Sequence, residues 1–115
     1  NVFIHDPKVN LKQIEKDLCQ NALKISDFID NKNKEKENGT LFHSSNVDEC
    51  IINADAVVIM TEWDEYKHLN WQKYESLMRQ PSWVFDTRYI LKEEDFRNLK
   101  INFWQIGNGK IFLNN

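Results

Sequence analysis

Two short polar strings, each directly after an apolar run, are the part of this sequence with the clearest chemical potential. They are Thr61-Glu62-Trp63 and Asp86-Thr87-Arg88. An arginine guanidinium presents a planar fork of N–H donors that matches two oxygens of a phosphate or diphosphate. If the two strings lie side by side, Arg88 and Thr61 would line one anion-binding crevice. The alternative is a surface arginine paired with Asp86 or Glu62, and the residue types alone leave both interpretations open.

The other reactive side chains give weaker indications. The histidines are not spaced with Asp, Glu or Cys as a metal site requires, and the cysteines lack C-x-x-C spacing. Each cysteine is therefore expected to be a buried or half-buried reduced thiol. The string Gly107-Asn108-Gly109 is not followed by the helix that a dinucleotide fingerprint needs. We expect no metal site and no cofactor phosphate loop in this chain. The residues considered are His5, His43, His68, Cys19 and Cys50.

A sheet is needed to bring the two polar strings together. The apolar run 56–60 is typical of a strand buried on both faces of a parallel sheet, and 83–85 predicts the next strand. Ligands of open α/β sheets bind at the carboxyl ends of such strands. Further strands are expected at 2–5, 40–43 and 103–106. Helical segments are expected at 11–25, capped by Asn10, at 47–51, at 93–99 and at 71–78, capped by Asn70, with Trp71, Tyr74, Leu77 and Met78 facing the core. Residues 64–69 are expected to form a turn or a short helical piece.

This alternation of strands and helices predicts the fold class. Strand–helix units in succession form a three-layer α/β fold with a mainly parallel, doubly wound, Rossmann-like sheet. We expect one domain over residues 1–115. The charged, Asn/Lys-rich run at 30–38 has no apolar periodicity, and it is expected to be a solvated surface loop within that domain.

The bulk composition limits the classes of partner. The chain has 115 residues, of which 41% are hydrophobic and 29% charged, as in globular domains. A net charge of −3 gives no basic surface for nucleic acid. No apolar run approaches the roughly 20 residues of a membrane span, and the first residues do not resemble a signal peptide. We therefore expect a cytoplasmic protein with neither a membrane nor a nucleic acid as partner.

An ordered set of segments resembles a known family. The segments are His5-Asp6-Pro7-Lys8-Val9, Ala54 to Trp63, Leu69-Asn70-Trp71, Val84-Phe85-Asp86-Thr87-Arg88 and Gln105-Ile106-Gly107. Together they closely resemble the C-terminal UDP-binding domain of the UDP-glucose/GDP-mannose dehydrogenase family, in its UDP-glucose 6-dehydrogenase branch. The resemblance covers about residues 2–110, apart from the charged loop.

The resemblance implies a function for the protein as a whole. Members of this branch oxidise UDP-glucose to UDP-glucuronate in two NAD-dependent steps, through a cysteine in a glycine-rich motif. NAD would be bound mainly by parts of the enzyme outside this chain, and the complete enzyme would be a homo-oligomer. Neither Cys19 nor Cys50 has neighbouring glycines. The chain is therefore expected to bind the UDP-sugar, to contain no catalytic residue and to be inactive alone.

The resemblance also implies roles for the two polar strings. Arg88 matches the arginine with which the family contacts the bound UDP-sugar. Around it, Thr61, Glu62, Trp63 and Asp86 would shape the substrate-binding crevice, with Asp86 orienting Arg88. Thr87 stands where the family has glycine. Because a β-branched residue disfavours positive φ, the backbone of this turn is expected to differ from the family's.

Two alternative functions stay open: a dehydrogenase for another nucleotide sugar, such as GDP-mannose or a UDP-N-acetylhexosamine, and a non-catalytic α/β binding module. In the family, a strand, a loop rich in glycine and lysine, and a helix precede the strand that begins here at Val2. That preceding strand is central in the sheet. We therefore expect a sheet that lacks its first central strand, and a chain that alone is marginally stable or associates. A binding module would instead fold as a stable monomer.

Overall fold

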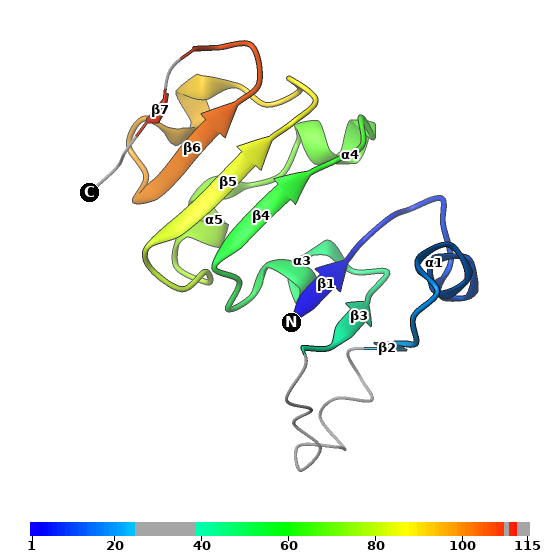
Figure 1. Ribbon diagram of the computed structural model, residues 1–115. Coiled ribbons are helices and arrows are strands. Elements are labelled where there is room, and N and C mark those ends of the chain that lie inside the picture. The colour runs from blue at the N-terminus through cyan, green and yellow to red at the C-terminus, as the bar shows by residue number, and fades with distance from the viewer. Residues whose placement is uncertain (25–38, 110, 113–115) are drawn as a thin grey trace. The chain divides into compact units, whose positions relative to one another are not determined.

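The structure, a computed structural model, describes residues 1–24, 39–109, 111 and 112 (Figure 1). The predicted charged loop at 30–38, and the end of the predicted first helix at residue 25, lie outside the described residues. The chain divides into two compact units, Asn1–Cys50 and Ile51–Asn115, and each is considered by itself. A single domain over residues 1–115 stays a prediction. None of the described helices combines the length and apolar character needed to cross a membrane.

The first unit is built on a parallel sheet of three strands in the order β1-β3-β2. These strands are β1 (Val2–Ile4), β2 (Ala22–Lys24) and β3 (Leu41–His43). Phe42 of the central strand is fully buried, and its ring stacks on that of Phe3 with centroids 4.8 Å apart. This pair lies in register across β1 and β3 and anchors the sheet.

Helix α1 (Leu11–Leu18) ends earlier than the sequence predicts. Its start is as predicted, because the side chain of Asn10 accepts a hydrogen bond from the N–H of Gln13 at 2.9 Å. Cys19 adopts a left-handed φ of 51° and closes the helix, and Ala22 begins strand β2. The predicted helix over 11–25 is therefore wrong beyond Leu18. Spacing alone cannot separate a short apolar strand from a helical turn, and the pairing of β2 with β3 decides it.

The second unit is built on a sheet of four strands in the order β4-β5-β6-β7. The first three, β4 (Ala56–Ile59), β5 (Ser82–Asp86) and β6 (Ile101–Gln105), are parallel, and β7 (Ile111–Phe112) is antiparallel to β6. The helices are α4 (Asp64–Lys67), α5 (Trp71–Glu75) and the 3₁₀ helix η1 (Glu93–Phe96), while α3 (Val47–Ile51) spans the boundary between the units. The predicted α/β class with mainly parallel strands is confirmed.

The core of the second unit packs α5 and η1 against the sheet. The ring of Trp71 lies 5.2 Å from that of Phe96, which in turn stacks on Phe103 of β6 at 4.2 Å. As predicted, Asn70 caps α5 by accepting the N–H of Lys73 at 3.1 Å. The predicted core stripe is confirmed for Trp71, Tyr74 and Met78, which are buried, although Leu77 is half-buried and the helix ends at Glu75. This packing fixes η1 against the middle of β6 and α5 against η1.

Strand β4 differs from the predicted strand buried on both faces. It lies at one edge of the described sheet and pairs with β5. Val58 is 51% exposed, and Met60, just after the strand, is 68% exposed. Ile59 is buried. An edge position explains the difference, because an unbroken apolar run predicts burial only when strands and helices cover it from every side.

Candidate functional site

The carboxyl ends of β4 and β5 lie side by side, as the two polar strings require. Ile59 is in register with Asp86, so residues 60–63 and 87–91 leave the sheet at the same edge. Thr87 joins the two segments directly. Its N–H and its hydroxyl both donate to the carbonyl oxygen of Ile59, at 3.2 and 2.6 Å. The condition under which Arg88 and Thr61 would line one crevice, that the two strings lie side by side, is therefore met.

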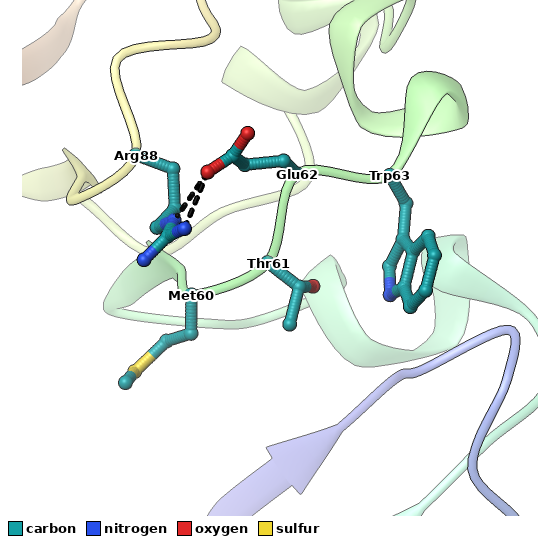
Figure 2. Close-up of a pocket in the computed structure, with 5 residues that line it drawn as sticks. All are labelled: Met60, Thr61, Glu62, Trp63 and Arg88. Atoms are coloured by element: carbon teal, nitrogen blue, oxygen red, sulfur yellow. Dashed lines mark hydrogen bonds and ion pairs between the residues drawn. The ribbon is translucent and has the colours of Figure 1, made fainter.

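A pocket of about 330 Å³ opens at this edge, and Figure 2 shows the residues around it. Its volume is at the lower end of the range of small-molecule sites. The pocket includes the first polar string and Arg88, together with one residue that the sequence analysis did not select, Met60. An apolar residue just after a strand gives no chemical indication of a site in the sequence, and only its exposure in the structure draws attention to it. The lining residues are Met60, Thr61, Glu62, Trp63 and Arg88.

The guanidinium of Arg88 is held by Glu62. Nε donates to Oε1 of Glu62 at 3.0 Å, and Nη2 donates to the same oxygen. Nη1 has no partner within the described part of the chain and points away from Glu62 (Figure 2). Both side chains are about half exposed, at 48% and 56%. The arginine therefore lines a pocket and also forms the surface ion pair that was the alternative interpretation.

The side chains of the first string point in different directions. Figure 2 shows Glu62 directed at Arg88, while the ring of Trp63 points away from this pair. Thr61 and Trp63 are half-buried. The pocket thus offers a cation, a carboxylate, a hydroxyl and an aromatic ring within one short stretch of backbone, which is a set of groups suited to a charged, hydroxyl-rich ligand.

Asp86 does not line the pocket and is fully buried beside it. Its Oδ1 accepts the backbone N–H of Arg88 at 3.1 Å. Its Oδ2 accepts the N–H groups of Ile90 and Leu91 at 2.9 and 2.8 Å. Asp86 is therefore placed to shape the turn that bears Arg88, not to touch a ligand.

The backbone of this turn is left-handed at Tyr89, where φ is 59°. Thr87 does not adopt a positive φ. The turn therefore does not require, at Thr87, the glycine that the resemblance implies there. Tyr89 is 63% exposed and sits directly after Arg88. A bulky residue in this conformation is uncommon, and such strain gathers at functional sites.

A second exposed ion pair offers a contrast to Arg88 and Glu62. Arg79 donates to both oxygens of Asp55, with Nε at 2.9 Å from Oδ1. This hydrogen-bonded guanidinium lowers the pKa of the Asp55 carboxyl, and the carboxylate raises the pKa of Arg79. Neither residue is among those that line the pocket. The pair is therefore an arginine–carboxylate contact of the same unit that lies outside the candidate site, and it serves as a comparison for Arg88 and Glu62.

The predicted burial of the two cysteines is confirmed for Cys50 and wrong for Cys19. Cys50 is half-buried, and this burial, followed by the neighbouring charge of Glu49, raises its pKa to about 11. A thiol with a raised pKa is protonated near neutral pH and is a poor nucleophile. Cys19 is exposed and closes helix α1. Both are free cysteines.

The described residues contain no group of three His, Cys, Asp or Glu side chains that could hold a metal ion. His5 follows β1, His43 ends β3 and His68 closes α4. Gly107 and Gly109, both at positive φ, lie between β6 and β7, so a strand follows them where a dinucleotide fingerprint would have a helix.

Comparisons with known proteins identify close relatives of this chain. A model of the UDP-glucose/GDP-mannose dehydrogenase family, UDP binding domain, matches residues 1–93. UDP-glucose 6-dehydrogenase 3 of Oryza sativa subsp. japonica is 32% identical over 110 residues, which are 92% of this chain and 22% of the relative. UDP-glucose 6-dehydrogenase 4 of Arabidopsis thaliana is 31% identical over the same shares. UDP-glucose 6-dehydrogenase of Rickettsia prowazekii (strain Madrid E) is 32% identical over 79 residues, 69% of this chain and 18% of the relative. The chain spans about a fifth of the length of these relatives.

Proposed function

The chain belongs to the UDP-glucose/GDP-mannose dehydrogenase family, whose UDP-binding domain it matches, and from this premise we propose that it binds the UDP-sugar in an NAD-dependent UDP-glucose 6-dehydrogenase. The complete protein would oxidise UDP-glucose to UDP-glucuronate with two NAD. This chain would supply contacts to the nucleotide sugar. The rest of the polypeptide would supply the catalytic cysteine and most of the NAD site.

The position of Arg88 carries the proposal. The residue stands at the carboxyl end of β5, next to the end of β4, and lines a pocket with Thr61, Glu62 and Trp63. Ligands of parallel α/β sheets bind at such strand ends. A guanidinium that is half exposed and has an unused Nη1 can donate hydrogen bonds to a diphosphate without moving far.

The remaining site residues would have supporting roles. Thr61 can donate its hydroxyl to a phosphate oxygen, and Trp63 provides apolar surface at the other side of the pocket. Glu62 holds the guanidinium in place when no ligand is bound, and its carboxylate can accept hydrogen bonds from sugar hydroxyls. Asp86 would orient Arg88 from beneath the turn, since it accepts the N–H of that residue.

The setting of the proposed enzyme follows from the family. We propose a cytoplasmic homo-oligomer with UDP-glucose as its substrate and with neither a membrane nor a nucleic acid as partner. The proposed enzyme would use NAD as its cofactor, and NAD would accept hydride in each of the two oxidation steps. In this chain, neither Cys19 nor Cys50 would take part, because the first closes a helix and the second has a raised pKa.

The proposal is tested with the complete protein that contains this chain, in its natural form and as Arg88→Ala. The natural form should produce about two NADH per UDP-glucose and none with GDP-mannose, because an alcohol needs two hydride transfers to become a carboxylate. Arg88→Ala should raise KM for UDP-glucose about 10- to 100-fold, since it removes charge-assisted hydrogen bonds, and leave KM for NAD within about twofold.

Arg79→Ala is the matched control for this experiment. It removes an arginine of similar exposure and similar carboxylate pairing in the same unit, so KM for UDP-glucose should stay unchanged. NADH formation with GDP-mannose alone would be consistent with membership of the family and would mean that the substrate is GDP-mannose and not UDP-glucose. The absence of NADH with either sugar would favour a non-catalytic binding module. Equal effects of Arg88→Ala on both KM values would contradict the role of Arg88.

A further inference from the structure

The turn that bears Arg88 is built around the buried carboxylate of Asp86. Three backbone N–H groups, those of Arg88, Ile90 and Leu91, donate to its two oxygens at 2.8 to 3.1 Å. Asp86 has no exposed surface. The path of residues 87–91 is therefore set by where this side chain is held, because a buried acceptor that loses its donors is strongly unfavourable.

Gln105 is the side chain that holds Asp86 from the neighbouring strand. The two residues are in register across β5 and β6. One amide group, Nε2 of Gln105, donates to Oδ2 of Asp86 at 2.9 Å and to the carbonyl oxygen of Leu91 at 2.8 Å. Gln105 is itself 4% exposed. It thus fixes both the carboxylate at the start of the turn and the backbone at its end.

The turn that bears Arg88 is also fixed at its start, by hydrogen bonds to β4. Thr87 donates through its N–H and its hydroxyl to Ile59 of β4, directly before the residues that line the pocket. Arg88 therefore extends from a segment fastened to β4 at one end and to Gln105 at the other. A change at Gln105 would shift the guanidinium relative to Thr61 and Glu62, and small displacements of a binding group are costly.

We propose that Gln105 is a positioning residue that acts through Asp86 and Leu91 to aim Arg88 at the UDP-sugar. The inference rests on the proposed function of Arg88. The inference goes beyond that proposed function because Gln105 lies outside both the pocket lining and the residues 1–93 that the family model matches. In this arrangement Gln105 makes no contact with the ligand, and its whole effect on binding passes through Arg88.

The test is a double-mutant cycle in the complete protein, with KM for UDP-glucose and for NAD as readouts. Gln105→Met keeps the length of the side chain and removes both N–H donors. It should raise KM for UDP-glucose about tenfold and leave KM for NAD unchanged. In the Arg88→Ala background the same substitution should have no further effect. Gln105→Asn, which retains the amide on a shorter side chain, should raise KM less, and it replaces the methionine variant if that variant fails to fold.

Asn102→Leu is the matched control, since Asn102 is a buried amide at the other end of the same strand. It should lower the melting temperature without raising KM for UDP-glucose. The inference is overturned if Gln105→Met leaves KM unchanged, if its effect persists in the Arg88→Ala background, or if Asn102→Leu raises KM equally. In those cases an effect of Arg88→Ala alone would still support the proposed function. An Arg88→Ala variant with unchanged KM would overturn both.

Discussion

At the scale of the residue, the central feature is that Arg88 already has an anionic partner. Both nitrogens that bond Glu62 use one carboxylate oxygen, and both side chains are about half exposed. Ion pairs of this exposure contribute about 0–1 kcal/mol to stability, because water screens them. If Arg88 binds a diphosphate as proposed, the diphosphate would therefore displace Glu62 from the guanidinium, or share the guanidinium with it, at little cost.

The substitution Glu62→Gln tests this competition. It keeps the shape of the side chain and removes the negative charge, so the inhibition constant of UDP, used as a competitive ligand of the complete protein, should fall by up to about fivefold. Asp55→Asn makes the same change in the pair with Arg79 and should leave the constant unaltered. A weaker inhibition by UDP after Glu62→Gln would instead mean that Glu62 accepts a hydrogen bond from the ligand.

At the scale of the element, the sequence predicted features that depend on local patterns. The caps at Asn10 and Asn70 and the buried faces of Trp71 and Tyr74 were predicted from residue type and spacing. What failed depends on contacts distant in sequence. Whether residues 22–24 form a helix or a strand is decided by pairing with β3, and the exposure of β4 by its place at a sheet edge.

In the candidate site too, local patterns predicted some features, and contacts distant in sequence decided others. The sequence predicted Arg88 and the pocket-lining string, but it gave Gln105 no role, because the partner of Gln105 is fixed by strand register. Because the resemblance implies glycine at the position of Thr87, any unusual backbone of the turn was expected at that residue. The structure instead places the left-handed residue at Tyr89. Tyrosine has no particular preference for this conformation, so no local pattern predicts it.

The left-handed conformation at Tyr89 leads to a prediction about stability. For a residue with a Cβ, this conformation costs about 1–2 kcal/mol, whereas asparagine tolerates it better than most residues. In the complete protein, Tyr89→Asn should therefore be at least as stable as the natural form, and Tyr89→Val about 1 kcal/mol less stable than Tyr89→Asn. Both variants lose the same exposed ring, so thermal unfolding of the two compares backbone preference alone. Equal melting temperatures would mean that the turn is not left-handed in solution.

At the scale of the whole molecule, the sheet of each compact unit has a strand at its edge. Within the described residues, β4 lies at one edge of its sheet, and β1 at an edge of the other. Val58 and Met60 expose apolar side chains along or just after β4. Open edges that carry apolar residues pair readily with other chains. Expressed by itself, the chain of 115 residues is therefore expected to associate.

The substitution Val58→Lys tests whether the β4 edge drives this association. A charge on an edge strand opposes pairing with another strand, so the 115-residue chain with Val58→Lys should sediment mainly as a monomer at concentrations where the natural chain forms dimers or larger species. Ile52→Lys is the control, because Ile52 is similarly exposed but lies in the turn before β4. It adds the same charge and should leave association unchanged. If the natural chain is already a stable monomer, the open edge is tolerated without a partner strand, which is the behaviour expected of a free-standing binding module. If both lysine variants reduce association equally, net charge rather than the strand edge is responsible.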